Sequence, residues 1–551
     1  MAELSEEEAQ KAWPLTVAES SDYTRSSTLA EVEAFLEELK TLPAASSLSF
    51  TTFGETTEGR RLHAVTVSAP RDEATPARLR VLVNANIHGG EIEGKVAVQA
   101  ILREMAHGYH EELLKRVEVT FVPVFNADGN DRIARTNRVT QNGPEMGVGE
   151  RANAMGLDLN RDFVKLETPE VRSLTTLVRH LDPHAFMDLH TTNGSPHGYD
   201  LTYASSLSPN APAELASYMA ESFFPAVRET LGGERGFPIH VYDYGNFEYR
   251  RREPGSRGER GDPIRWSTYD SRPRFGTNLM GLRGKVSILS EAYSYLPYER
   301  RIAATYLFVV ECLRKLAADA DRVRKITSSQ AAAPGSTLTL GVDATLDSVG
   351  TVPVRVGRWN EVVIDLDPET EGVQQGRRRV SAGPDAVREV EMEVRSRFRA
   401  ERQAPYTEFF AVLDPSEEVT QALEVHLGPA TKGGALERVA DARVEVAASV
   451  FVVEEAKRSQ RPFQGHREVS VDGQWEERNI TLPQGTLLVK SSILTAHLLH
   501  PESDDSLTTW NFFDAHLFRD ADREEGEGAA EDREDASKGG AALTHPVVLI
   551  R

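Results

Sequence analysis

Residues 79–91 read Leu-Arg-Val-Leu-Val-Asn-Ala-Asn-Ile-His-Gly-Gly-Glu, and this stretch decides the fold. Its first part is a nearly continuous apolar run, which is typical of a strand buried on both faces of a sheet. The run leads into His88, and Glu91 follows three residues later across Gly89-Gly90. Glycines permit a tight turn, so the imidazole and the carboxylate can face one point. Glu93 is a rival for this pairing, but its spacing from His88 is less suitable.

The surrounding sequence alternates short apolar runs with stretches of helical periodicity. We predict strands at 62–67, 79–87, 117–125, 185–190 and 286–291, and helices at 29–40, 92–106, 169–180, 212–231 and 299–317. Strands that alternate with helices favour an α/β fold with a mainly parallel (mixed) sheet flanked by helices. We expect a helical segment in residues 1–46 that leads into a main domain at 47–330.

Polar side chains fall at the ends of four predicted strands, namely His88, Asn126, His190 and Glu291. In open α/β sheets, ligands bind beyond the carboxyl ends of the strands. His190 shares one strand face with Asp188, whereas the rival His184 lies at the other end of that strand. Two histidines and one carboxylate leave the fourth position of zinc open to water, which is the pattern of a catalytic site. The sequence therefore predicts one Zn²⁺ ion held by His88, Glu91 and His190.

Glu291 is the predicted general base and acid. It ends the apolar run Val286-Ser-Ile-Leu-Ser-Glu291 at the same edge of the sheet as the metal ligands. Next to a zinc-bound water, such a carboxylate can accept a proton during attack and return it to the leaving amine. This combination favours a zinc-dependent peptidase or amidase.

Composition excludes several other classes of protein. The chain of 551 residues carries a net charge of -22, which argues against nucleic acid or an anionic membrane as a partner. Cys312 is the only cysteine, so neither an intrachain disulfide nor a cysteine-based metal site can form. The acidic start lacks an apolar signal region, and no segment reaches the ~18 apolar residues of a membrane span. We expect a soluble, cytoplasmic protein.

The composition changes near Ala331-Ala-Ala-Pro-Gly-Ser336, where helical periodicity gives way to short alternating runs. We predict a β-rich accessory domain at 336–551, with strands near 337–342, 352–356, 361–365, 444–453 and 485–489. The charged, low-complexity stretch 519–540 is expected to be a disordered insertion. The apolar residues 546–550 after it predict a returning edge strand.

Taken together, the motifs resemble the zinc carboxypeptidases of the carboxypeptidase A type over about residues 20–320. The shared features are His-x-x-Glu, a late histidine, a late strand-end glutamate and four short segments. These segments are Gly54-Glu-Thr-Thr-Glu-Gly-Arg60, Asn126-Ala-Asp-Gly129, Arg132-Ile-Ala-Arg-Thr-Asn-Arg138 and Gly156-Leu-Asp-Leu-Asn-Arg-Asp-Phe163. Ala127 departs from the family's usual proline. The C-terminal phrase around Trp510-Asn-Phe-Phe513 looks like that of large bacterial members.

The resemblance implies further roles. Arg135 would stabilise the oxyanion, and Asn160 with Arg161 would hold the terminal carboxylate of the substrate. Tyr269 is our candidate for the family's mobile tyrosine, with Tyr242 and Tyr244 as competitors. Independently of the resemblance, the basic composition of residues 235–274 is typical either of a solvated loop or of a rim that attracts acidic substrates. In the second case Arg274 and Asn278 could line the specificity pocket.

The leading hypothesis is therefore a zinc metallocarboxypeptidase whose substrate is the C-terminus of a peptide or protein. A zinc amidase acting on cell-wall peptides or N-acyl amino acids is the first alternative. A non-catalytic binding protein on the same scaffold is the second, and the complete set of ligands plus Glu291 argues against it.

Overall fold

The computed structural model describes residues 13–70, 77–192, 194–233, 237–250, 261–328, 338–366, 374–406, 409–413, 415–440, 444–458, 464–466, 469–499 and 547–550. No helix in these ranges combines the length and the apolar character needed to cross a membrane.

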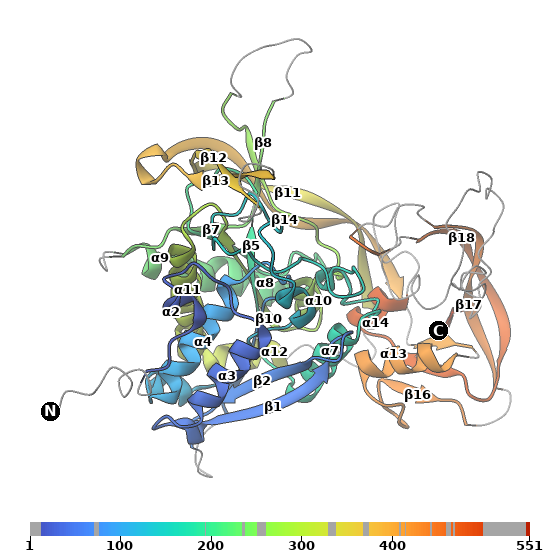
Figure 1. The fold of residues 1–551 in the computed structure, drawn as a ribbon. Coiled ribbons are helices and arrows are strands. Elements are labelled where there is room, and N and C mark those ends of the chain that lie inside the picture. Colours follow the sequence, from blue (N-terminus) through green and yellow to red (C-terminus); the bar gives the residue numbers. More distant parts are fainter. Residues whose placement is uncertain are drawn as a thin grey trace.

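An eight-stranded mixed sheet forms the centre of the molecule, in the order β1-β2-β4-β3-β5-β10-β6-β7 (Figure 1). The inner strands β4, β3, β5 and β10 are mutually parallel. β2 and β6 pair antiparallel with β4 and β10, and β1 pairs antiparallel with β2. The predicted fold class is confirmed. The strands are β1 Leu48–Glu55, β2 Arg61–Val67, β3 Leu79–Ala85, β4 Val117–Val122, β5 Ala185–Thr192, β6 Leu201–Ala204, β7 Val241–Asp243 and β10 Val286–Tyr293.

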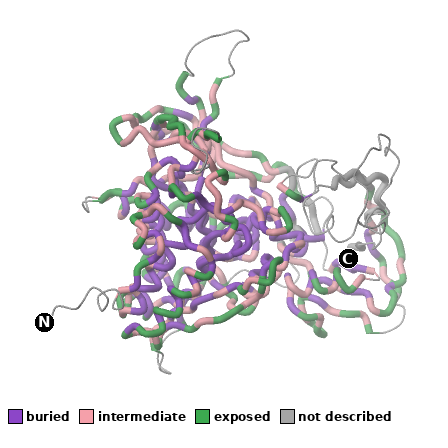
Figure 2. The backbone as a smooth tube through the Cα atoms, viewed as in Figure 1, coloured by how far each residue is buried: buried purple, intermediate pink, exposed green. Residues whose placement is uncertain are grey.

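Both faces of this sheet are covered because its central strands are apolar on both sides. In β3, Val81 and Val83 pack into one buried cluster with side chains of α3, α4 and α11, and Leu82 packs into a second cluster with α7 and α10. Figure 2 shows the resulting buried interior of the α/β body. The helices are α2 Val17–Ser20, α3 Leu29–Leu39, α4 Glu93–Ala106, α5 Glu111–Leu114, α6 Ala127–Asp131, α7 Pro169–Leu181, α8 Ala213–Tyr218, α9 Phe224–Gly232, α10 Gly276–Leu282, α11 Tyr298–Ala318 and α12 Ala320–Ser328.

Two sequence-based boundaries need adjustment. The helix expected at 212–231 is divided into α8 and α9 by a π-helical turn at Met219–Phe223. The short strands expected at 337–342 and 352–356 are parts of one long strand, β11 Leu338–Val356. Its pairing with β14 Arg388–Tyr406, which shifts in register between Asp347 and Gly350, continues through most of the stretch between the two predicted strands.

The described residues from 338 onward, here called the C-terminal unit, are rich in strands and share a second sheet with the preceding part of the chain. β11 and β14 share a sheet with β9 Arg265–Ser267 and β8 Asn246–Glu248 of the preceding part of the chain. In Figure 1 these two long strands run between the α/β body and the orange-red end of the molecule. The other elements are the hairpin β12 Trp359–Asp365 and β13 Gln375–Ser381, β15 Phe409–Val412, α13 Glu417–Leu427, β16 Leu436–Arg438, β17 Val444–Arg458, β18 Val469–Leu482, β19 Leu487–Lys490, α14 Ile493–Leu499 and β20 Val547–Ile550.

The C-terminal unit also shares an apolar core with the α/β body. Val419 and Leu423 of α13 belong to the same buried cluster as Val171 and Leu174 of α7. The last strand, β20, pairs with β15 on one side and β17 on the other, so the expected edge strand is in fact interior and that prediction was wrong. The expected insertion at 519–540 lies outside the described residues.

Candidate active site

The loop after β3 brings His88 and Glu91 together through a compact turn. The Glu91 amide donates to the His88 carbonyl at 2.9 Å. Asn86 adopts a left-handed φ of 61°, and its side-chain amide donates to the carbonyls of His88, Gly89 and Glu91. Gly89 is required for space, since a Cβ there would lie 2.3 Å from the backbone carbon of Gly129. The turn thus depends on close backbone packing.

His88, Glu91 and His190 form one buried cluster, with a ligand atom of each within 4.8 Å of the others. The Nδ1 atoms of both histidines face the Glu91 carboxylate, each at 3.0 Å from a different oxygen. All three residues are buried. Although burial opposes ionisation, His88 and Arg138 hold the pKa of Glu91 well below its ordinary value.

The far nitrogen of each imidazole faces a second carboxylate. His88 Nε2 lies 2.9 Å from Asp158 Oδ1, and His190 Nε2 lies 3.0 Å from Asp188 Oδ2. A proton held at Nε2 by these acids leaves Nδ1 free to bind a cation, which is the usual second shell of a histidine-zinc site. The buried Nδ1 of His88 has no hydrogen-bond partner among the described residues. The donor set and this orphaned atom fit a zinc ion.

The two rival ligands are engaged elsewhere. Glu93 is fully buried and pairs with Arg301 Nε at 2.6 Å. His184 lies at the start of β5, where its Nδ1 accepts the Arg80 amide at 3.0 Å. Neither belongs to the cluster of possible metal ligands.

Glu291 lies beside this cluster on the neighbouring strand. In the parallel pairing of β10 with β5, Glu291 is in register with His190. Its side chain keeps partial exposure within an otherwise buried strand. Burial raises the pKa of Glu291 to about 8; the positive charge of His190 opposes this rise, and the negative charge of Glu91 adds to it. A carboxyl group with a pKa near neutrality is suited to proton transfer.

Two arginines that the sequence reasoning did not single out contact the cluster. Arg138 donates from Nη1 to Glu91 Oε1 at 2.9 Å and from Nη2 to the Thr191 carbonyl at 2.8 Å. Arg151 pairs with Asp158 Oδ2 at 2.8 Å and lies 3.5 Å from Glu91 Oε1. Arg135 instead faces Met146 Sδ at 3.7 Å and lines a hollow of about 220 Å³ together with Arg138 and Arg378 of β13.

Asn160 and Arg161 lie two and three residues after Asp158, and Asn160 reaches the cluster. The Asn160 side-chain nitrogen is 3.5 Å from His190 Nε2, while its oxygen accepts the Gly276 amide at 2.9 Å. The Arg161 guanidinium stacks over the ring of Phe275 at 4.2 Å. Asn160 is thus held beside His190, and Arg161 beside Phe275.

Tyr269 and Tyr244 lie against each other, with ring centroids 5.3 Å apart. Burial and the charge of Glu291 raise the pKa of both phenols, that of Tyr244 to about 12. Tyr269 hydrogen-bonds Thr277 at 3.2 Å. Tyr242, the other competitor, stacks on Tyr199 instead.

The proposed rim and specificity residues are partly used in structural contacts. Arg274 pairs with Asp270 at 2.7 Å, and the Asn278 amide donates to the carbonyls of Asp270 and Arg272. Arg265 pairs with Glu248 and Glu393. The arginines of the expected rim between 251 and 260 lie outside the described residues.

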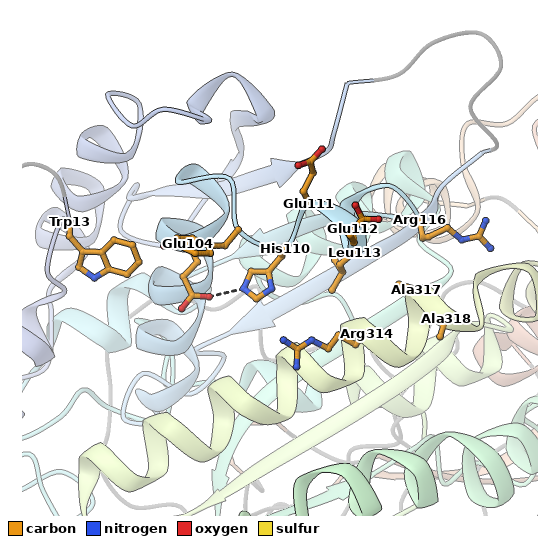
Figure 3. Close-up of a pocket in the computed structure, with 11 residues that line it drawn as sticks. Trp13, Glu104, His110, Glu111, Glu112, Leu113, Arg116, Arg314, Ala317 and Ala318 are labelled. Atoms are coloured by element: carbon orange, nitrogen blue, oxygen red, sulfur yellow. Dashed lines mark hydrogen bonds and ion pairs between the residues drawn. The ribbon is translucent and has the colours of Figure 1, made fainter. Parts of the chain in front are cut away.

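Figure 3 shows a hollow of about 880 Å³ with a different lining. Its lining includes Glu104 and His110, which pair at 2.6 Å at the end of α4, whereas Glu91 precedes the start of that helix. None of its lining residues belongs to the His88 cluster.

The fold is a mixed α/β sheet flanked by helices, and the His88 cluster is a candidate metal site at the edge of that sheet. Residues 32–275 match the family model of the zinc carboxypeptidases. Carboxypeptidase 2 of Trichophyton tonsurans is 27% identical over 155 residues, which make up 27% of this chain and 26% of that protein. Carboxypeptidase D of Homo sapiens is 31% identical over 120 residues, 19% of this chain and 9% of that protein. The match therefore spans well under two thirds of either relative.

Two solved structures are similar at low identity. The metallo-carboxypeptidase of Burkholderia cenocepacia has a TM-score of 0.40 and 18% identity, covering 54% of this chain and 70% of that one. The carboxypeptidase A of Helicoverpa armigera has a TM-score of 0.39 and 14% identity, covering 54% of this chain and 75% of that one.

Proposed function

We propose that this protein is a zinc-dependent metallocarboxypeptidase that removes residues from the C-terminus of a peptide or protein. The observation that carries this proposal is the arrangement of His88, Glu91 and His190, with both Nδ1 atoms turned inward and Glu291 in register beside them. The family match supports the same class of reaction.

Bound zinc would lower the pKa of a water molecule and polarise the scissile carbonyl. The Glu291 carboxylate would accept the proton of the attacking water and donate it to the leaving amine nitrogen. Asp158 and Asp188 would keep the imidazoles in the tautomer that has a free Nδ1.

The substrate would be held by its terminal carboxylate. Asn160 and Arg161 are proposed to bind that group, because an arginine can engage a carboxylate with two parallel hydrogen bonds. Tyr269 is proposed to cover the substrate. The ring of Tyr244 lies against that of Tyr269, so Tyr244 is the alternative candidate. Such contacts would restrict cleavage to a chain end.

Arg135 and Arg138 are both candidates for stabilising the oxyanion. The family resemblance favours Arg135. The contacts of Arg138 with Glu91 and the Thr191 carbonyl favour Arg138. Either guanidinium would stabilise the charge that develops on the carbonyl oxygen in the transition state.

The test is metal analysis of the purified protein followed by digestion of a peptide library. Each peptide is supplied with a free and with an amidated C-terminus, and products are identified by mass spectrometry. We expect one zinc per chain and stepwise loss of C-terminal residues from the free peptides only. Equal cleavage of both forms would support the amidase alternative, and a protein with no affinity for zinc would refute the proposal.

A further inference from the structure

A turn of the C-terminal unit, Gln464–His466, holds the main chain of Asp158 from both sides. The Asp158 amide donates to the Gln464 carbonyl at 3.1 Å. His466 Nε2 lies 3.0 Å from the Asp158 carbonyl oxygen, and it donates to that acceptor. More than three hundred residues separate the partners in sequence. Asp158 is the carboxylate that faces the His88 imidazole. The 464–466 turn is therefore linked to His88 of the candidate metal centre through Asp158.

The shape of the turn is specific to this contact. Gln464 and Gly465 both have left-handed backbones, with φ of 52° and 90°. Gly465 lies so close to the 156–158 segment that a Cβ would be 2.4 Å from the Gly156 carbonyl oxygen. A side chain at position 465 would therefore push the turn away from Asp158.

His466 is buried and both of its ring nitrogens face acceptors. Nδ1 lies 2.7 Å from Glu167 Oε2, and Nε2 faces the Asp158 carbonyl. A neutral imidazole can donate only one hydrogen, so two acceptors require the imidazolium. Burial opposes the charge, but the hydrogen bond to Glu167 and the charges of Asp162 and Glu167 raise the pKa of His466.

Asp162, Glu167 and His466 are also close enough together to suggest a second metal site. The hydrogen bonds argue against that interpretation. The oxygens of Asp162 accept the amides of Glu167 and Thr168 and the hydroxyl of Thr168. Both nitrogens of His466 are occupied as well. Asp162, Glu167 and His466 therefore form a hydrogen-bonded contact between the C-terminal unit and the α/β body.

The same segment offers a matched contact for comparison. His426 of α13 is equally buried and also comes from the C-terminal unit. Its Nε2 lies 3.1 Å from the Val164 carbonyl oxygen, six residues beyond Asp158. His426 thus joins the C-terminal unit to the α/β body through Val164 and not through Asp158, the residue that faces His88. The shared apolar cluster of α7 and α13 holds the two parts together independently of either histidine.

We propose that His466 is a positioning residue: by fixing the main chain of Asp158 it sets the orientation of the His88 imidazole, which makes the C-terminal unit part of the metal centre. This inference rests on the proposed function in that His88 is taken as a zinc ligand. It assigns a task to a part of the chain that lies beyond the matched residues 32–275.

The experiment compares His466→Ala, His466→Gln and His426→Ala in the full chain. The zinc dissociation constant is measured by competition with a chelator, the apparent Tm on the metal-free protein, and kcat and KM with a susceptible peptide. We expect His466→Ala to weaken zinc binding by about tenfold, at the lower end of the effect of losing an outer-shell partner. His466→Gln should retain most of the zinc affinity, because the side-chain amide of glutamine can donate to the Asp158 carbonyl. His426→Ala should lower the Tm but leave the zinc affinity within about twofold, since it has no contact with the outer shell.

Unchanged zinc affinity in His466→Ala, or an equal loss in His466→Ala and His426→Ala, would overturn the inference. If His466→Ala does not fold, Gly465→Ala provides the same test, because it displaces the turn and keeps the imidazole. A wild-type protein that binds no zinc would refute the proposed function itself. A wild-type protein that binds zinc without cleaving peptides would leave the zinc-affinity comparison as a full test of His466.

Discussion

Glu291 performs the proton transfer in the proposed mechanism, so its replacement is the sharpest test at the scale of a single residue. Glu291→Gln keeps the shape of the side chain but cannot accept a proton. We expect kcat to fall by roughly 10²–10⁴, the usual contribution of a general base, while zinc stays bound. Steady-state kinetics and metal analysis of the same preparation check this. Turnover near the wild-type rate would remove Glu291 from the mechanism.

A second prediction at this scale separates Arg138 from Arg135. Arg138 already contacts Glu91, whereas Arg135 faces Met146. We expect Arg138→Ala to lower kcat by about 10²–10³, the range for loss of an oxyanion donor, and Arg135→Ala to have a smaller effect. Both variants are compared at saturating peptide. The opposite order would assign the task to Arg135, as the family resemblance does.

At the scale of the elements, the contact between the 464–466 turn and the segment 156–167 should depend on pH. The pKa of His466 is raised from its ordinary value of 6.5 by Glu167 and Asp162, against the effect of burial. Because the folded pKa exceeds the unfolded one, the stabilisation is complete below about pH 6.5 and is lost as the pH rises through the folded pKa. Asp162 acts in the same direction: burial raises its pKa to about 6, so its ionisation also favours the unfolded state.

The measurement is the apparent Tm of wild type and His466→Gln from mildly acidic to mildly alkaline pH. We expect the Tm of the wild type to exceed that of His466→Gln most at acidic pH, and this difference to shrink at alkaline pH. A Tm difference that is constant across the pH range would show that His466 is neutral in the folded protein.

At the scale of the whole molecule, metal binding should stabilise the fold. The cluster draws its ligands from the loop after β3 and from β5, so an ion bound there joins two parts of the central sheet. A ligand present at about a hundred times its dissociation constant contributes ~2.7 kcal/mol to the folded state. We expect chelation to lower the apparent Tm and added Zn²⁺ to restore it. A Tm that does not respond to zinc in the wild type, measured beside His88→Ala as control, would contradict the assignment.

The sequence alone determined the features that are encoded locally. The apolar runs predicted the central strands, because buried parallel strands are apolar on both faces. The same runs predicted that His88, His190 and Glu291 would gather at one edge, since the carboxyl ends of parallel strands meet there. Asp188 was recognisable in the same way, as it shares a strand face with His190.

Only the tertiary structure decided the contacts between distant segments. Nothing in the spacing of Arg132-Ile-Ala-Arg-Thr-Asn-Arg138 distinguishes Arg138 from Arg135, because that loop has no fixed periodicity. The position of β20 inside its sheet depends on pairing with two distant strands. The contact of His466 with Asp158 likewise joins two loops whose sequences carry no sign of each other. Such contacts arise when separate elements pack into one core, and local sequence patterns do not encode them.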